Sequence, residues 1–298
     1  MALLSILASM ALASGNVIVG LSAGSTSVVA AGFEFVGDVL ASTVVFVGMV
    51  IAAKPADSDH PYGHGRFETL AGLAVGLILA AGGLGICYRS LQGVSSAHAP
   101  PQLYAIYPLV GAIAIRSIMS TTKFKVGRRI HSASLVADAR NDAVDILSAS
   151  AALVALGLTI YNPSRFLVAD HYGGFTVGLV VIFTGLRVMR DTSLDLMDTM
   201  PDPDSLNQIR KVASGVPGVI GVEKCFARKT GLQYHVDLHL EVDPNLTVWE
   251  SHDIATLTRI RLREGLHWIA DVLVHIEPAL GIEHRPSRDA AEDSERTK

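Results

Sequence analysis

Two pairs of oxygen-bearing side chains stand in otherwise apolar stretches of the chain: Glu34 with Asp38, and Asn141 with Asp145. The members of each pair are four residues apart, so on a helix each pair points to one face. Charged side chains at bilayer depth are costly and usually line the path of an ion or a proton. Two such pairs on two helices could form one four-oxygen site for a divalent cation. The sequence therefore favours an ion transporter.

The helices that carry these pairs are predicted from a shortage of charge. The 298-residue chain is 50% hydrophobic and 17% charged, whereas about a quarter of a soluble globular domain is charged. A helix needs about 20 mostly apolar residues to cross the bilayer core. The first apolar stretch lacks the basic segment of a secretory signal and leads directly into the next, so we expect it to be a membrane helix. We predict six membrane helices, near residues 2–24, 27–53, 67–91, 103–124, 132–160 and 168–191.

The composition changes after the sixth span. Charges become frequent from Pro201, and no later stretch is long enough to cross a membrane. We therefore predict a six-helix transport domain over residues 1–200, a soluble α/β domain over 201–280, and a disordered charged tail over 281–298. The expected elements of the soluble domain are a helix over 203–214, strands over 219–228 and 232–242, a helix over 248–266 and a strand over 269–277.

Basic residues predict the orientation in the membrane. Lys54 and Arg66 follow the second span, whereas Lys123, Lys125, Arg128 and Arg129 follow the fourth. Because Lys and Arg gather in cytoplasmic loops, both loops, both termini and the soluble domain are expected in the cytoplasm. With a rise of about 1.5 Å per residue, Glu34 and Asp38 lie roughly 12 and 18 Å from one face. Asn141 and Asp145 lie roughly 15 and 21 Å from the other, so both pairs fall near the midplane.

The spacing leaves the fifth span ambiguous. Asp138, Asn141, Asp142 and Asp145 all lie within two turns, and spacing alone does not decide whether Asn141 or Asp142 joins Asp145. Asp138 and Asp142 are therefore additional candidates. A structural alternative is that the acids pair with Arg116 of span four, and that Asn141 forms an interhelical hydrogen bond.

Several motifs resemble the cation diffusion facilitator family of divalent-metal/proton antiporters. The loop KPADSDHPYGHGRFE at 54–68 is similar to the family's KPxDxxHPYGHGKxE, and ADARNDAVD at 137–145 is similar to ADAxHxxxD. FEFVGD at 33–38 occupies the place of (H/D)xxxD, and LMDTMPD contains an LMD segment with Asp198. SHDIA at 251–255 and VHIEP at 274–278 resemble parts of the cytoplasmic domain. The resemblance extends from about Gly20 to Pro278. It implies a transport site of Glu34, Asp38, Asn141 and Asp145.

Departures from the family pattern bear on the cargo. Asn141 replaces the usual His, Glu34 is the first residue of its pair, and Ala31 stands where an Asp is common. Zinc favours imidazole and thiolate ligands, whereas an all-oxygen site favours harder cations. We therefore expect efflux of Mn²⁺ or Fe²⁺, with Zn²⁺ close behind. The resemblance implies exchange for protons, which must then be carried by carboxylates, because burial and neighbouring acids favour their protonated form.

A second group of donors, Asp57, His60 and His64, lies in the loop after span two. One Asp and two His, with the histidines four residues apart, could hold a metal ion with one open position. The alternative is that this segment only folds a tight loop, since Pro61, Gly63 and Gly65 demand special backbone conformations.

The soluble domain holds a third group. The strand around Tyr234–Glu241 alternates, so that His235, Asp237, His239 and Glu241 share one face. The order of its elements resembles the family's ferredoxin-like, metallochaperone-like domain. That resemblance implies a homodimer and a regulatory metal site of His239, His252, His275 and Glu277, with Glu223 near the position of a further His in some zinc members.

Other classes of function are less compatible with the sequence. The net charge of −4 does not favour nucleic-acid binding, and Cys87 and Cys225, without a CxxC motif, suggest inert thiols. No nucleophile elbow, P-loop or HExxH motif points to an enzyme. A membrane-anchored metal sensor or scaffold is the alternative from another functional class. An ion channel is a further alternative. We expect a lipid-embedded, multi-pass protein of a bacterial plasma membrane.

Overall fold

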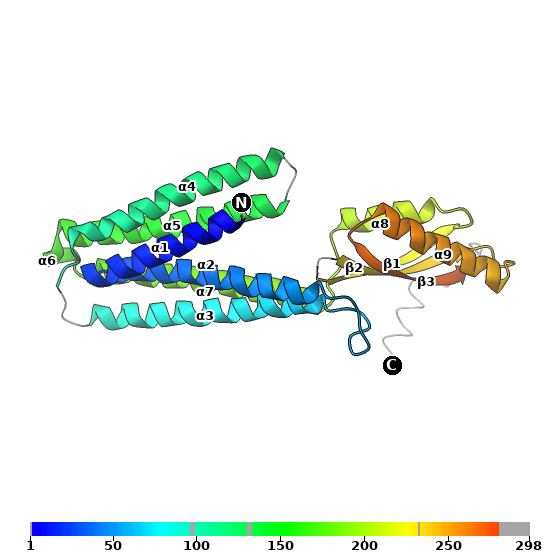
Figure 1. The fold of residues 1–298 in the computed structure, drawn as a ribbon, viewed down its shortest axis with the longest axis horizontal. Helices are drawn as coiled ribbons and strands as arrows, with labels where there is room; N and C mark the ends of the chain where they lie inside the picture. The colour runs from blue at the N-terminus through cyan, green and yellow to red at the C-terminus, as the bar shows by residue number, and fades with distance from the viewer. Residues whose placement is uncertain (1, 96–98, 130–132, 232, 280–298) are drawn as a thin grey trace, which may run out of the picture. The chain divides into compact units, whose positions relative to one another are not determined.

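The computed structural model describes residues 2–95, 99–129, 133–231 and 233–279 (Figure 1). It divides into two compact units, one of residues 1–51 and 67–193 and the other of residues 52–66 and 194–298. The predicted tail over 281–298 and residue 132, the predicted start of the fifth span, lie outside the described residues.

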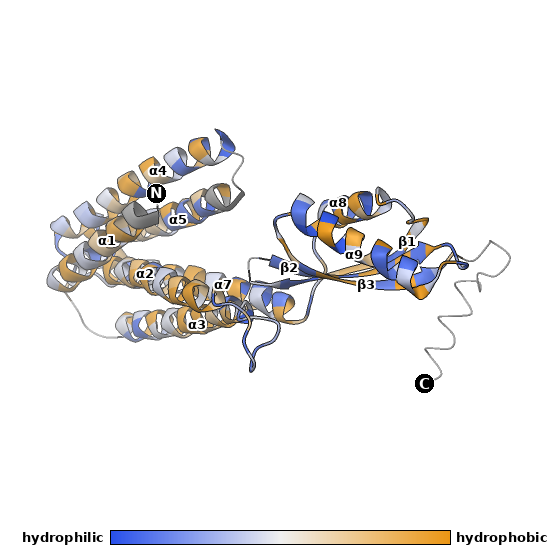
Figure 2. Cartoon of the chain, turned by 45° about the vertical axis from the view of Figure 1, so that its right-hand side comes forward, coloured by the Kyte–Doolittle hydropathy of each residue, from blue (hydrophilic) through white to orange (hydrophobic). Residues whose placement is uncertain are grey.

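Six helices in the described residues are long and apolar enough to cross a membrane, which confirms the six predicted spans. These helices consist mainly of apolar residues, whereas the C-terminal domain mixes polar and apolar residues (Figure 2). A 3₁₀ turn, η1 (Leu103–Ala105), precedes the fourth span, and a short helix, α6 (Pro163–Phe166), follows the fifth. The six helices are α1 (Ala2–Ala23), α2 (Thr26–Ala52), α3 (Arg66–Val94), α4 (Ile106–Arg129), α5 (Ala133–Tyr161) and α7 (Ala169–Leu196).

The fourth helix is longer than predicted. The predicted span ends near residue 124, with Lys123 assigned to the following loop, but α4 continues to Arg129. Lys123 is a buried residue of this helix, with 3% of its surface exposed. A buried lysine needs a counter-charge, and acids of α5 provide it.

Glycines bring α3 and α7 close together. A Cβ atom on Gly76 would lie 2.9 Å from the carbonyl oxygen of Gly185, and one on Gly83 would lie 2.8 Å from that of Gly178. Membrane helices lack a hydrophobic drive to associate, so they pack through small residues that let their backbones approach. The two glycine contacts, seven residues apart on each helix, fix the register of this antiparallel pair.

A carboxylate from α7 caps the start of α2. Asp170, 2% exposed, accepts hydrogen bonds from Ser25 Oγ at 2.8 Å, from the backbone N–H of Thr26 at 2.6 Å, and from the hydroxyl of Ser27. The neighbouring His171 Nδ1 lies 2.8 Å from Thr26 Oγ1. The first N–H groups of a helix have no partner within it, and an acid there also interacts favourably with the helix dipole. This contact, not predicted from the sequence, anchors α2 about two turns before Glu34.

The C-terminal domain has the predicted order of elements: α8 (Pro203–Ser214), β1 (Gly221–Thr230), β2 (Gln233–Val242), α9 (Val248–Gly265) and β3 (Ile269–Pro278). The sheet order is β1-β2-β3, with β1 and β2 antiparallel and β2 and β3 parallel. Asp202 accepts from the N–H of Ser205 at the start of α8, and Thr247 and Glu250 form a capping box at the start of α9.

The alternation predicted for β2 is confirmed. Val236, Leu238 and Leu240 are at most 1% exposed and pack in one core with Ile209 of α8 and Leu262 of α9. The opposite face of β2, which carries the histidines, is left for polar contacts.

Candidate metal centres

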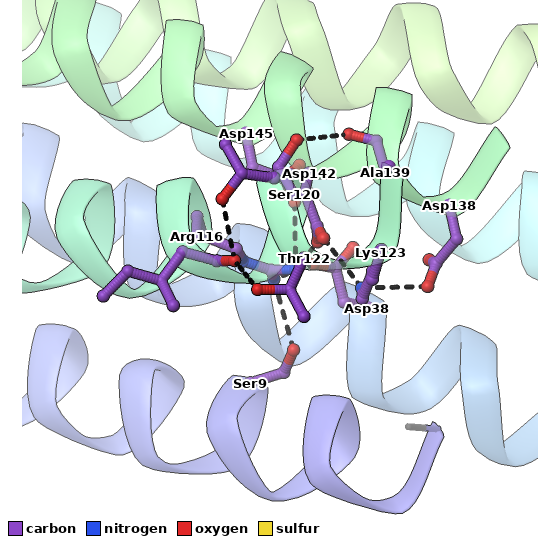
Figure 3. Close-up of polar contacts among 12 residues, drawn as sticks. Ser9, Asp38, Arg116, Ser120, Thr122, Lys123, Asp138, Ala139, Asp142 and Asp145 are labelled. Carbon is purple, nitrogen blue, oxygen red and sulfur yellow. Dashed lines mark hydrogen bonds and ion pairs between the residues drawn. The ribbon is translucent and has the colours of Figure 1, made fainter. Parts of the chain in front are cut away.

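Acidic side chains of α2 and α5 meet inside the membrane unit (Figure 3). Glu34 and Asp145 are each 5% exposed and Asp142 is fully buried, whereas the side chain of Asp38 is 27% exposed. The two predicted helices thus bring three of the four predicted transport residues, Glu34, Asp38 and Asp145, into one region.

A buried arginine of α4 lies among these acids. Arg116 Nη2 is 2.6 Å from Asp38 Oδ2, and Nη1 is 2.7 Å from Asp142 Oδ1 and 3.2 Å from Asp145 Oδ2. Nη2 also donates to Ser9 Oγ of α1 at 3.2 Å, and the guanidinium lies 4.9 Å from the centre of the Phe35 ring. Arg116 therefore joins α1, α2, α4 and α5 through one planar cation, whose fork of donors suits carboxylates.

Lys123, two turns further along α4, completes the charge network. Its Nζ lies 2.7 Å from Asp142 Oδ2 and 2.8 Å from Asp138 Oδ2. Asp142 therefore holds a different cation on each of its oxygens. The additional candidates Asp138 and Asp142 belong to this ion-pair network. The sequence offers pairing of the acids with Arg116 as an alternative to a metal site, and these contacts agree with that alternative.

The predicted transport residues do not converge on one point in this arrangement. Glu34 Oε2 accepts a hydrogen bond of 2.9 Å from Ser148 Oγ, on the α5 face that also carries Asp145. Asn141 is exposed, and in the described part of the chain its side chain makes no hydrogen bond to the acids. The carboxylates of Asp38, Asp142 and Asp145 are arranged around the Arg116 guanidinium instead.

The loop between α2 and α3 brings its three predicted donors together. The ligand atoms of Asp57, His60 and His64 lie within 4.8 Å of one another. Asp57 Oδ1 is 3.3 Å from His60 Nδ1, and Asp57 Oδ2 is 3.4 Å from His64 Nε2. The backbone N–H of His60 donates to Asp57 Oδ1 at 2.7 Å and is the main cause of a lowered pKa of Asp57. Asp57 is thus held ionised, which is the form that binds a cation.

A second group forms on the sheet of the C-terminal domain. The ligand atoms of His239, His275 and Glu277 also lie within 4.8 Å of one another. Glu277 Oε1 is 2.5 Å from His239 Nδ1 and 3.6 Å from His275 Nε2. His252, the fourth predicted donor, is exposed on α9 and is not among these residues.

A β-bulge directs Glu223 toward this group. The pairing of β1 with β2 shifts between Val222 and Lys224, which leaves Glu223 between the paired residues. The Glu223 carboxyl hydrogen-bonds to Glu277, which raises the pKa of Glu223 and lowers the pKa of Glu277. The ionised Glu277 beside two imidazoles is a donor set suited to a divalent transition metal.

Six membrane helices joined to a small α/β domain, with buried ion pairs between the helices, define a multi-pass membrane protein. Residues 2–197 match the model of the cation efflux transmembrane domain, and residues 201–279 match that of the cation efflux protein cytoplasmic domain. The chain therefore belongs to the cation efflux family, a family of transporters, as the sequence motifs predicted.

Curated relatives match almost the whole chain. The manganese efflux system protein MneP of Bacillus subtilis is 28% identical, with 93% of this chain and 95% of the relative covered. The manganese efflux system protein MneS of the same organism is 30% identical, with 93% and 94% covered. Metal tolerance protein C1 of Arabidopsis thaliana is 29% identical over 93% of this chain and 61% of its own length.

Solved structures are similar to about a quarter of this chain. The solved C-terminal domain of MamM is 29% identical and covers 26% of this chain and 99% of its own, with a TM-score of 0.25.

Proposed function

We propose that this protein exports divalent transition-metal cations from the cytoplasm through a site formed by Glu34, Asp38, Asn141 and Asp145. The observation that carries the proposal is that α2 and α5 bring buried carboxylates together inside the membrane unit. Buried acids at that depth are costly unless they serve a cation or proton path. Metal would bind where Arg116 now contacts Asp38 and Asp145.

The preferred cargo is Mn²⁺ or Fe²⁺, with Zn²⁺ close behind. All four proposed ligands offer oxygen, and hard oxygen donors favour these cations over zinc in relative terms. The names of MneP and MneS, two relatives at 28% and 30% identity, support manganese.

Transport is an exchange of metal for protons by alternating access. The proposed ligands include three carboxylates and no histidine, so protons would bind to Glu34, Asp38 or Asp145 after the metal leaves. A site near the midplane can open to either side in turn.

The C-terminal domain forms a homodimer and responds to metal. Its donors His239, His275 and Glu277 already lie together, and Asp57, His60 and His64 form a comparable group in the cytoplasmic loop. A metal that binds one arrangement of the protein better than another shifts the population toward it. In this way cytoplasmic metal would promote its own export.

The test is metal-driven proton flux in proteoliposomes with Mn²⁺, Fe²⁺, Zn²⁺ and Mg²⁺. Asp145→Ala should abolish the flux, whereas Asp191→Ala, which changes an exposed acid of α7, should leave it unchanged. Flux that survives Asp145→Ala would place the transport site elsewhere. Metal binding without flux of any cation would favour a membrane-anchored sensor.

A further inference from the structure

Arg116 contacts one oxygen each of Asp38 and Asp145, two of the proposed ligands of the transported metal. Its Nη2 lies 2.6 Å from Asp38 Oδ2, and its Nη1 lies 3.2 Å from Asp145 Oδ2. A metal ion must approach these oxygens to about 2.0–2.2 Å. Two cations cannot share the same carboxylate oxygens at such distances, because their repulsion is strong in a buried site. Metal and guanidinium therefore compete for Oδ2 of Asp38 and Oδ2 of Asp145.

Asp142 offers the guanidinium a place to withdraw to. It is fully buried, and its Oδ1 lies 2.7 Å from Arg116 Nη1. Its other oxygen lies 2.7 Å from Lys123 Nζ, so Asp142 has a second cationic partner that does not depend on Asp38. The ring of Phe35 lies beneath the guanidinium and stabilises its charge without choosing between the carboxylates.

The Arg116 guanidinium does not use all of its hydrogen-bond donors. Its Nε is buried and, in the described part of the chain, has no hydrogen-bond partner. Its contact with Asp145 is also the longest of its three ion pairs. A buried donor left without an acceptor weakens the arrangement that contains it, so this guanidinium is easier to displace than a fully bonded one.

On these grounds, and resting on the proposed function, we propose that Arg116 is a built-in competitor of the transported metal. It binds Asp38 and Asp145 when metal leaves them, and it withdraws to Asp142 when metal enters. The carboxylates are then compensated by a cation in both situations. Arg116 thereby weakens metal binding and speeds metal release, and it acts as a positioning residue for Asp38 and Asp145.

The size of the effect follows from occupancy. If the guanidinium holds the two acids for nine-tenths of the time, the apparent affinity for metal is about tenfold weaker than the intrinsic one. Arg116→Gln should therefore bind Mn²⁺ about tenfold more tightly. In proteoliposomes it should lower KM and also lower kcat, because tighter binding slows release.

The experiment is Mn²⁺ titration calorimetry on the full-length protein in detergent. The binding component that is lost in Asp145→Asn is assigned to the transport site, and its affinity is compared between wild type and the Arg116 variants. Arg116→Gln should tighten this component, and Arg116→Lys should tighten it less because a cation remains. Arg190→Gln, which changes an exposed arginine of α7, is the matched control and should bind as wild type does. An unchanged or weaker affinity in Arg116→Gln would overturn the proposal and leave Arg116 a structural residue.

Asp142→Asn should change the Mn²⁺ affinity in the opposite direction to Arg116→Gln. Without its fixed counter-ion, Arg116 is drawn more fully onto Asp38 and Asp145, so Mn²⁺ binding should weaken. In the Arg116→Gln background the same change should have little effect; an equal loss there would mean that Asp142 acts directly on the metal. Should Arg116→Gln not fold, Arg116→Lys decides, because wild-type or weaker affinity in that variant also overturns the proposal. If wild type has no component that Asp145→Asn removes, the proposed transport site itself is wrong.

Discussion

Arg66 at the start of α3 and Asp198 after α7 form an ion pair across 132 residues of sequence, with Nη2 of Arg66 2.9 Å from Oδ1 of Asp198. Asp198 is the one non-glycine residue in the described part of the chain with a positive φ, 55°. Such a backbone is uncommon for residues other than glycine. The contact therefore places a strained residue at the point where the last membrane helix gives way to the C-terminal domain.

This relationship predicts different effects for two substitutions of Asp198. Both Asp198→Ala and Asp198→Gly remove the ion pair, but only glycine accepts the positive φ without strain. Asp198→Gly should therefore be more stable than Asp198→Ala by about 1 kcal/mol. Arg66→Gln removes only an exposed pair and should cost between 0 and about 1 kcal/mol. Both tryptophans of the chain, Trp249 and Trp268, lie in the C-terminal domain, so their fluorescence during thermal unfolding provides the measurement. Equal stability of the two Asp198 variants would contradict the strain.

The glycine contacts of α3 and α7 give a second prediction. A Cβ on Gly185 would lie 2.7 Å from the backbone nitrogen of Ala80 and 2.8 Å from the carbonyl oxygen of Gly76. Because neither atom can move without its helix, Gly185→Ala should destabilise the membrane unit by about 1–3 kcal/mol. Gly157→Ala is the matched control, since no neighbour lies within 4 Å of its Cβ position. Thermal unfolding in detergent should rank Gly185→Ala below wild type and Gly157→Ala at or above it. A Gly185→Ala variant as stable as wild type would mean that the helices separate easily.

The fold was largely predictable because its signals are local. Mostly apolar stretches of helix length marked all six spans, and period-two alternation with turn residues marked the strands of the C-terminal domain. The end of α4 was missed because Lys123 was counted as a loop charge. Its buried partner Asp142 lies on another helix, and only the packed structure shows that contact.

The sequence predicted which residues belong to the candidate sites better than it predicted how these residues are arranged in space. Spacing placed Asp57, His60 and His64 together, because they share one short loop. It could not place His252 relative to His239, since α9 and β2 meet only through the tertiary fold. The capping of α2 by Asp170 was missed for the same reason, as an acid at the start of a helix ordinarily caps its own helix.

Asp170 itself gives a third prediction. It is 2% exposed and accepts from Ser25 Oγ and from the backbone N–H of Thr26. Asp170→Asn keeps the shape but replaces one acceptor oxygen with a donor that faces donors, so it should cost about 1–3 kcal/mol. The exposed control Asp191→Asn should unfold at the wild-type temperature. If Asp170→Asn also does so, the carboxylate is dispensable as a cap.

The carboxyl pair of the C-terminal domain predicts a dependence on pH. The pKa of Glu223 is raised by its hydrogen bond to Glu277, whose pKa is lowered. Above its raised pKa, Glu223 is ionised and repels Glu277, which costs stability; as the pH falls through that pKa, Glu223 becomes a donor and the cost disappears. Glu277 has the opposite effect on the free energy of unfolding. Its ionised form stabilises the domain at a pH above the usual pKa of a glutamate, and this stabilisation is lost as the pH falls through its lowered pKa.

Glu223→Gln isolates the first of these effects. Its amide donates to Glu277 at every pH, so at pH 7 the variant should be more stable than wild type. The gain should be below about 1 kcal/mol, since the pair is close to solvent. The difference should shrink as the pH falls into the carboxylate range, as measured by tryptophan fluorescence during thermal unfolding. A gain that is constant with pH would mean that the amide stabilises the domain by another contact.

Asn141→His tests the oxygen-based choice of metal. Imidazole is a preferred zinc ligand, so replacing the amide should raise the ratio of Zn²⁺ to Mn²⁺ transport by about tenfold, equivalent to about 1.4 kcal/mol. Asn141→Asp keeps an oxygen donor and should leave the ratio near wild type. The test is stringent because Asn141 is exposed, and in the described part of the chain no hydrogen bond joins it to the acids around Arg116. To reach a metal between Asp38 and Asp145, its face of α5 must turn toward α2 when the guanidinium withdraws. An altered ratio in Asn141→His would therefore report both the ligand and that rearrangement, whereas an unchanged ratio would remove Asn141 from the transport site and leave the three carboxylates to bind the metal.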